Sequence, residues 1–166
     1  LHGPILKENL GYYIGKYMTW SSYEPEDDGV LVAYASIHGN TKKAAEKMKE
    51  ILEAKGAKKV AITDLSRDDM AEAIEDAFRY DKLVLAAASY DASVFPCMET
   101  FLNKLTNKNY QNRKIAIIEN GSWAPTAARV MTGMFEKSKD ITWLEHSVKI
   151  MSSLSEENEK ELDAMA

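Results

Sequence analysis

Short apolar runs alternate with amphipathic segments from residue 28 onward, and this alternation restricts the fold more than any other feature of the chain. The run at residues 30–34 carries no charge, as expected of a strand that is buried on both faces of a sheet. Residues 41–55 then place apolar side chains on one helical face and Lys and Glu on the other. The same pattern predicts further strands at 60–63, 83–87, 115–118 and within 141–150, and helices at 68–79, 96–105, 126–137 and 155–165.

This order of elements predicts the fold class α/β, with a doubly wound, five-stranded parallel sheet that helices cover on both faces. Residues 1–28 stand outside the alternation, and there we expect a helix at 7–20 followed by a polar linker. The chain is thus divided into a leading segment, 1–28, and an α/β domain, 29–166. Ligands of doubly wound sheets bind beyond the carboxyl ends of the strands, so the loops after residues 34, 87 and 118 are the candidate site.

Charge and composition exclude several classes of partner. The net charge is −5 and acidic and basic residues are mixed, which argues against nucleic acid as the main partner. No apolar run approaches the roughly 20 residues of a membrane helix, and no signal peptide is visible, so we expect no membrane partner and a cytoplasmic location. The single cysteine, Cys97, excludes an intramolecular disulfide.

The first candidate loop, residues 36–41, has a composition suited to a phosphate. It offers hydroxyl and amide side chains and a glycine, directly before a helix whose N-terminus presents free N–H groups. It has neither the lysine of a P-loop nor a Gly-x-Gly-x-x-Gly pattern, which makes a triphosphate or NAD less favoured. The alternative is that Asn40 or Thr41 only caps the helix.

This loop resembles the phosphate loop of the flavodoxin family, which has the form Thr/Ser-x-Thr-Gly-x-Thr. His38 stands where the family has its second hydroxyl residue. The resemblance implies a flavodoxin-like sheet with strand order 2-1-3-4-5, FMN as the cofactor, and electron transfer as the function. The residues that it assigns to the FMN phosphate are Ser36, His38, Gly39, Asn40 and Thr41.

The second loop, 88–96, resembles the flavodoxin loop that approaches the isoalloxazine ring, although the usual Pro-Thr is missing. The residues that the resemblance assigns to FMN here are Ser89, Tyr90, Asp91 and Ala92. Tyr90 is a plausible ring contact because an aromatic face can stack on the flavin. The alternative is a Tyr packed under its own loop.

The third loop, 119–125, resembles the family segment Gly-Ser-Tyr-Gly-Trp-Ser-Gly, and its Trp coincides with Trp123. Gly121 replaces the family's Tyr and Glu119 replaces its first Gly. The resemblance places Glu119, Asn120, Gly121 and Trp123 at the cofactor. The alternative for Trp123 is a side chain that only covers the start of the next helix.

Glu119 suggests a separate hypothesis on the redox potential. A carboxylate near the flavin would disfavour its reduced, anionic form and lower its potential. The hypothesis fails if Glu119→Gln leaves both flavin couples unchanged. The alternative is an exposed Glu at the end of a strand.

The beginning of the chain resembles the domain junction of the A-type flavoproteins (flavodiiron proteins). The segment 2–5 reads His-Gly-Pro-Ile, and the segment 17–21 reads Tyr-Met-Thr-Trp-Ser. His2 would match the last iron ligand of a preceding metallo-β-lactamase-like domain, but one imidazole cannot hold such a site, so we expect no metal here. The resemblance implies a C-terminal FMN domain that takes electrons from a redox protein such as rubredoxin. It would pass them to a di-iron domain of the same or a partner subunit, which reduces oxygen or nitric oxide.

Two alternative functions remain. The departures at His38, Glu119 and Gly121 are compatible with a flavodoxin-like interaction module that has lost FMN. A flavin-dependent NAD(P)H oxidoreductase would need a nicotinamide site, for which the sequence gives no signal.

Overall fold

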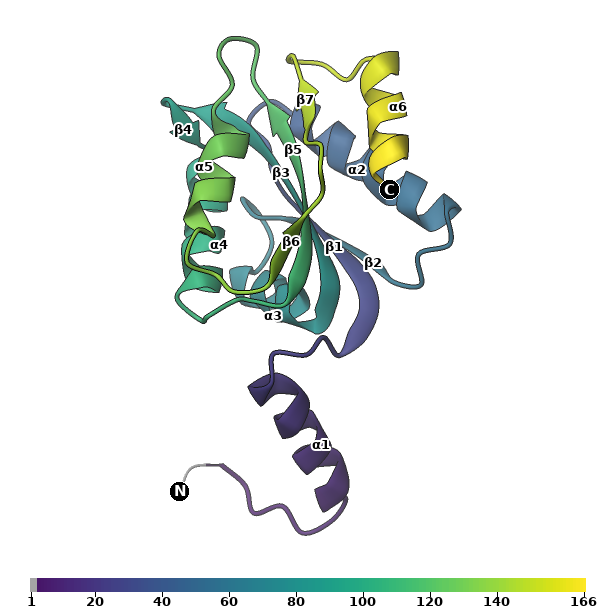
Figure 1. Cartoon of the computed structure of the whole chain (residues 1–166), viewed down its shortest axis with the longest axis vertical. Coiled ribbons are helices and arrows are strands. Elements are labelled where there is room, and N and C mark those ends of the chain that lie inside the picture. Colours follow the sequence, from purple (N-terminus) through teal and green to yellow (C-terminus); the bar gives the residue numbers. More distant parts are fainter. Residues whose placement is uncertain (1–2) are drawn as a thin grey trace.

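A twisted parallel sheet runs through the middle of the molecule, with helices on both faces and one helix projecting from an end (Figure 1). The computed structural model describes residues 3–166, so His2 lies outside the described residues. The strands are β1 (Asp27–Ala35), β2 (Val60–Asp64), β3 (Tyr80–Tyr90), β4 (Ser93–Val94), β5 (Arg113–Asn120), β6 (Ile141–Trp143) and β7 (Val148–Ile150). The helices are α1 (Leu10–Ser21), α2 (Asn40–Ala54), α3 (Met70–Arg79), α4 (Pro96–Thr106), α5 (Ala127–Met134) and α6 (Glu156–Met165).

The strand order β2-β1-β3-β5-β6 confirms the expected doubly wound arrangement. The last strand differs from the prediction, because it is split into two short pieces that both pair in parallel with β5. β6 lies against the beginning of β5 and β7 against its end, while residues 144–147 leave the sheet. This is an edge position, where exposed polar residues interrupt pairing at little cost.

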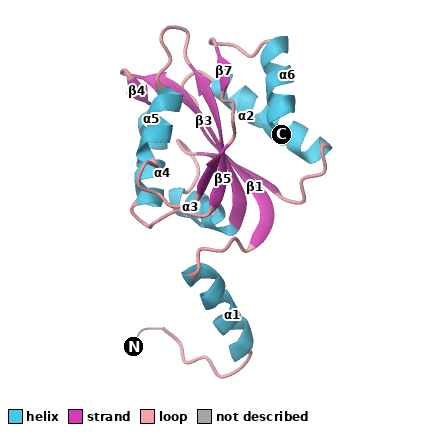
Figure 2. Ribbon diagram, in the orientation of Figure 1, coloured by secondary structure: helices cyan, strands magenta, loops and turns pink. Residues whose placement is uncertain are grey.

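Helices cover both faces of the sheet (Figure 2), and each face buries an apolar layer of its own. Leu31, Ala33 and Ala35 of β1 pack with α3, α4 and α5. Val30 and Val32 face the other side, where α2 and α6 cover them. This period of two on a strand buried on both faces explains why β1 reads as an uninterrupted apolar run.

The segment after the third strand is a tight hairpin rather than the open loop that the sequence suggests. β3 continues to Tyr90, and β4 returns antiparallel to it. Asp91 and Ala92 form the turn with φ of 48° and 55°, which is the type I′ geometry of two-residue hairpins. This turn is difficult to predict from the sequence, because Ala92 occupies a left-handed backbone conformation in which glycine is usual.

Helix α1 is attached to the domain by a small polar cluster, although none of its own residues is buried. The Glu26 carboxylate accepts a hydrogen bond from Trp20 Nε1 at 2.6 Å and one from Lys16, while Glu26 N–H donates to the Arg79 carbonyl at 2.9 Å. Burial acts to raise the pKa of Glu26, but the hydrogen bonds from Lys16 and Trp20 outweigh it and the pKa is lowered. The linker is therefore an ordered connection.

Arg113 holds this connection from inside the domain. Its side chain is 3% exposed, and its guanidinium donates to the carbonyls of Tyr23 at 2.7 Å and Phe78 at 2.5 Å. It lies 5.8 Å from the centre of the Tyr110 ring, and within residues 3–166 it has no carboxylate partner. Burial lowers the pKa of Arg113. One buried cation thus joins the linker, α3 and β5 through neutral acceptors.

Candidate functional site

The three loops singled out in the sequence meet at the carboxyl ends of β1, β3 and β5. They enclose a cavity of about 170 Å³. Its lining contains no Lys, Arg, Asp or Glu and consists of Ser36, Ile37, His38, Asn40, Thr41, Ala88, Ser89, Asn120, Gly121, Ser122 and Ser152. The cavity therefore offers hydroxyl, amide and backbone groups to a ligand.

The start of α2 forms one wall of the cavity and is open to an anion. Gly39 precedes the helix with φ of 88°, and its N–H donates to Ser36 Oγ at 3.0 Å. No side chain caps the helix, so the alternative of a simple cap by Asn40 or Thr41 is wrong. The N–H groups of Asn40, Thr41 and Lys42 have no acceptor among residues 3–166. Free N–H groups at the positive end of a helix dipole are the usual way to bind a phosphate.

Thr41 gives independent support for a ligand in the cavity. Its side chain is 2% exposed and lines the cavity, yet its hydroxyl makes no hydrogen bond with any other described residue. The buried polar side-chain atoms that lack a partner within residues 3–166 are Tyr110 Oη and Arg113 Nε, so the Thr41 hydroxyl keeps some accessible surface at the cavity. The hydroxyl is therefore free to donate a hydrogen bond to a ligand oxygen in the cavity.

Asn120 and Gly121 fix the opposite wall. Asn120 Nδ2 donates to the Ser152 carbonyl at 2.9 Å, and Ser152 N–H donates back to Asn120 Oδ1 at 3.1 Å. A Cβ on Gly121 would lie 3.0 Å from Pro125 Cβ and 3.2 Å from Ser89 Oγ, so a side chain at this position would force its neighbours to move by a few tenths of an ångström. The replacement of the family's Tyr by Gly121 is therefore part of a close loop packing.

Ser89 and Glu119 hold the first turn of α5. Ser89 Oγ accepts hydrogen bonds from the N–H groups of Thr126 at 2.8 Å and Ala127 at 3.1 Å. Glu119 Oε2 accepts from Ala128 N–H at 3.0 Å, and its Oε1 lies 3.7 Å from Lys149 Nζ. Glu119 is 4% exposed, so the alternative of an exposed Glu is wrong, and it does not line the cavity. Of the two, Ser89 alone contacts the cavity.

Two aromatic side chains stand exposed on the loops beside the cavity. Tyr90, at the base of the hairpin turn, is 49% exposed and contacts Phe95 edge-on at 5.7 Å. Trp123 is 90% exposed, so it does not cover the start of α5 as the alternative supposed. Asp91 and Ala92 form the exposed hairpin tip and do not line the cavity. Small polar groups therefore line the cavity, and the two large aromatic side chains lie outside it.

The size of the cavity limits what it can hold. Pockets for whole ligands usually measure roughly 300–1,000 Å³, so a cavity of about 170 Å³ suits a phosphate and its nearest atoms. The flat part of a larger ligand would have to lie outside, where Tyr90 and Trp123 are exposed. Larger hollows of about 680 and 740 Å³ occur at the other end of the sheet, beside Tyr23, and contain none of the predicted site residues.

The capping role of Glu119 leads to a stability prediction. Glu119→Gln keeps an oxygen that can accept from Ala128 N–H, and we expect it to lower the free energy of unfolding by less than about 1 kcal/mol. Glu119→Ala removes the acceptor and the buried packing and should cost about 2 kcal/mol. Urea unfolding measures both, with Glu99→Ala on the exposed first turn of α4 as the control. Equal losses for the two Glu119 variants would contradict the capping role.

Residues 3–166 contain no group of three or more His, Cys, Asp or Glu side chains placed to hold a metal ion. Within the same range, no helix combines the length and apolar character that crossing a membrane requires.

Comparison with known families places the site in context. Residues 31–148 match the model of the flavodoxin domain, which covers more than half of the chain. Among curated proteins, the anaerobic nitric oxide reductase flavorubredoxin of Aeromonas hydrophila is 23% identical over 143 residues, 85% of this chain and 29% of that protein. The flavorubredoxin of Escherichia coli is 18% identical over 124 residues. The chain thus spans less than a third of the length of these relatives.

Solved structures share the fold at low identity. The rubredoxin oxygen:oxidoreductase of Desulfovibrio gigas superposes with a TM-score of 0.83 at 15% identity, covering 94% of this chain and 38% of that one. A flavo di-iron protein variant from Thermotoga maritima gives 0.82 at 21% identity, covering 99% and 40%. Flavodoxin 1 of Bacillus cereus gives 0.70 at 14% identity, covering 83% and 94%. The expected flavodoxin-like fold is confirmed.

Proposed function

Because the chain belongs to the flavodoxin family of domains, we propose that it binds FMN at the cavity between β1, β3 and β5 and transfers electrons through it. Family membership indicates FMN as the cofactor. The observation that carries the proposal is the uncapped start of α2 together with the unpartnered Thr41 hydroxyl, which lines the cavity beside it. Both features offer hydrogen-bond donors to a phosphate.

Different residues at the cavity would contact the phosphate and the planar ring system of FMN. The N–H groups of Asn40, Thr41 and Lys42 donate toward a phosphate, and the hydroxyl of Thr41 adds a side-chain donor. The exposed rings of Tyr90 and Trp123 offer flat apolar surfaces to a planar ring system. Bound FMN would supply the redox chemistry, while the chain provides binding and orientation.

We further propose that the domain works inside a larger protein, as the leading segment 1–28 suggests. The flavorubredoxins and flavo di-iron proteins to which it is similar are more than twice its length. In such a protein the domain would accept electrons from a redox partner such as rubredoxin and deliver them to a di-iron domain of the same or a partner subunit.

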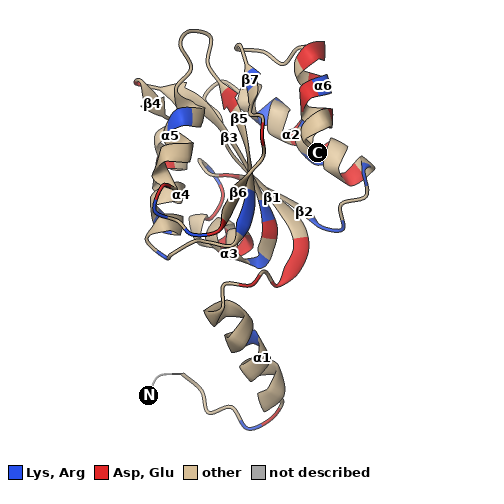
Figure 3. Ribbon diagram, viewed as in Figure 1, with Lys and Arg blue, Asp and Glu red and all other residues tan. Residues whose placement is uncertain are grey.

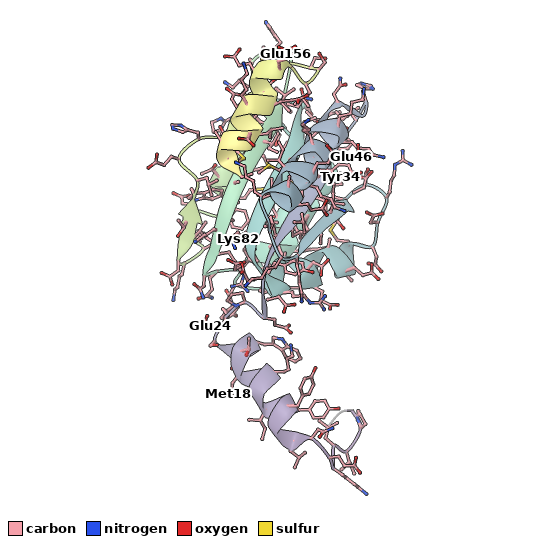
Figure 4. All side chains as sticks on the ribbon, turned by 90° about the vertical axis from the view of Figure 1, so that its right-hand side faces the viewer. Met18, Glu24, Tyr34, Glu46, Lys82 and Glu156 are labelled. Atoms are coloured by element: carbon pink, nitrogen blue, oxygen red, sulfur yellow. The ribbon has the colours of Figure 1, made fainter. Side chains whose placement is uncertain are left out.

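Helix α1 supports a covering domain at this end of the chain. Its ribbon is almost free of charged residues (Figure 3), and most of its side chains project away from the domain (Figure 4). Apolar patches of this kind on a folded chain usually mark an interface. The exposed apolar side chains of α1 are those of Leu10, Tyr12, Tyr13, Ile14, Tyr17, Met18 and Trp20.

The exposed face of α1 predicts that the isolated chain associates with itself. We expect Ile14→Asp to shift the chain toward monomer in sedimentation velocity, because a charge in the middle of the patch opposes its burial. Leu144→Asp, at an exposed apolar residue away from α1, serves as the matched control and should leave the distribution unchanged. The same distribution for both variants and the unmodified chain would argue against an interface on α1.

The proposed function is tested by titrating the purified chain with FMN. We expect flavin absorption bands that stay with the protein through gel filtration, quenched flavin fluorescence, and reversible bleaching on stepwise reduction and reoxidation. Riboflavin, which lacks the phosphate, should bind more weakly. A chain that takes up no FMN would refute the proposal and favour an interaction module of the same fold.

A further inference from the structure

His38 is the one side chain lining the cavity, among the described residues, that ordinarily titrates near neutral pH. It lies in the turn directly before α2, next to the free N–H groups of Asn40 and Thr41, and its side chain is exposed. The other lining residues supply neutral hydroxyl, amide, backbone and apolar groups. A phosphate in this cavity would therefore meet one ionisable group, and its charge would depend on pH.

We propose that His38 makes phosphate binding in this cavity depend on pH, with the imidazolium holding the FMN phosphate more tightly than the neutral ring does. The inference rests on the proposed FMN binding and adds a specificity determinant to it. An imidazolium beside a dianion gains a charge-assisted hydrogen bond that the neutral ring lacks. FMN should consequently bind more tightly near pH 6 than near pH 9, and riboflavin should not.

The other charged groups around the cavity do not ordinarily change their charge between pH 6 and pH 9. Lys42 and Lys43 follow in the first turn of α2, and Asp91 lies on the hairpin tip. Glu119 and Lys149 end β5 and β7 as a pair, and Glu156 and Glu157 begin α6. Carboxyl and lysine side chains ordinarily titrate below about pH 5 and above about pH 10, outside the window. The other histidine of the described range, His146, lines a different hollow beside the end of α6.

The linkage between the proton and the ligand fixes the direction of the effect. If the bound phosphate favours the imidazolium, the proton and the phosphate bind cooperatively, and the affinity for FMN falls as rising pH removes the proton. A phosphate that binds the imidazolium form about 10-fold more tightly than the neutral form loses affinity by roughly the same factor when the proton leaves. The phosphate itself loses its second proton near pH 6, which strengthens binding with rising pH and sets the acidic end of the window.

The test is the FMN dissociation constant between pH 6 and pH 9, measured by quenching of flavin fluorescence. The chains compared are the unmodified one, His38→Asn and His38→Gln. The two variants keep a hydrogen-bonding side chain of neutral charge at an exposed position, so the phosphate's own titration is common to all three. We expect the unmodified chain to lose about 5- to 10-fold more affinity than the variants over this range. NMR should show the His38 titration shifted upward by FMN and left in place by riboflavin.

The outcomes separate the two proposals. Parallel pH profiles for the three chains, with FMN bound, would overturn the role of His38 and leave the proposed function standing. Absence of FMN binding by the unmodified chain at every pH would refute the proposed function and this inference together. If the FMN affinity depends less on pH in both variants than in the unmodified chain, and FMN shifts the NMR titration of His38, then His38 is established as the pH-dependent phosphate contact.

Discussion

Thr41→Val is expected to weaken FMN binding by roughly 10- to 100-fold without destabilising the chain. The substitution replaces the hydroxyl with a methyl group of similar size, so one donor to the phosphate disappears while the packing stays. A hydrogen bond to a charged group contributes about 1.5–3 kcal/mol, which corresponds to this change in affinity. The ligand-free chain should be as stable as before or slightly more stable, because the hydroxyl has no partner in the described structure.

Thr41→Val should thus lower the affinity for FMN but not the stability of the ligand-free chain, and the two quantities are measured separately. Fluorescence titration measures FMN binding, and urea unfolding without FMN measures stability. Thr106→Val is the matched control, because the Thr106 hydroxyl donates to the Leu102 carbonyl at 3.0 Å within α4 and lies away from the cavity. Unchanged FMN affinity in Thr41→Val would exclude Thr41 from the phosphate contacts, and a large loss of stability would show that its hydroxyl has a structural partner.

Arg113→Met should lower the free energy of unfolding by about 3 kcal/mol, the largest stability effect that we expect in this chain. Methionine retains most of the aliphatic bulk but none of the donors, so the Phe78 carbonyl loses its side-chain donor and the Tyr23 carbonyl keeps only the longer hydrogen bond from Asn112 Nδ2 at 3.4 Å. Arg113→Lys should restore little of the loss, because an ammonium group lacks the planar fork that reaches several acceptors.

Urea unfolding followed by circular dichroism measures these losses, with Arg129→Met as the control. Arg129 is exposed on α5, where removal of a charge should change stability by less than about 0.5 kcal/mol. A loss below about 1 kcal/mol for Arg113→Met would mean that water replaces the guanidinium at these carbonyls. FMN binding should persist in the folded variant, since Arg113 starts β5 at the end away from the cavity.

The sequence by itself determined the fold class, the strand order through its resemblance, and the three loops of the site. Buried parallel strands must be apolar on both faces. The uninterrupted apolar runs at residues 30–34 and 83–87 therefore identify such strands from the local sequence alone. A phosphate loop is also local, since its groups come from consecutive residues at one helix start. The helix ends shifted by a few residues, as at α1, which begins at Leu10 rather than at residue 7.

Only the tertiary structure decided which side chains of those loops face the cavity. Glu119 follows an uninterrupted apolar strand, and the sequence allowed either an exposed carboxylate or one beside the flavin. The fold buries this carboxylate and directs it to the start of α5, a helix that begins eight residues later, where Ala128 N–H donates to it. Tyr90 likewise belongs to a hairpin that depends on the backbone of Asp91 and Ala92, which their side chains do not signal.

The same holds for Arg113 and Thr41, whose importance no local pattern reveals. Arg113 reads as a charged residue before a strand, yet its partners are 90 and 35 residues away in the chain. Thr41 reads as a helix cap, yet the fold buries it and leaves its hydroxyl free. A local sequence pattern indicates the backbone propensity and the burial of a segment, because these properties depend mainly on the segment's own residues. Hydrogen-bond partners are shared between segments, so the packed chain alone determines them.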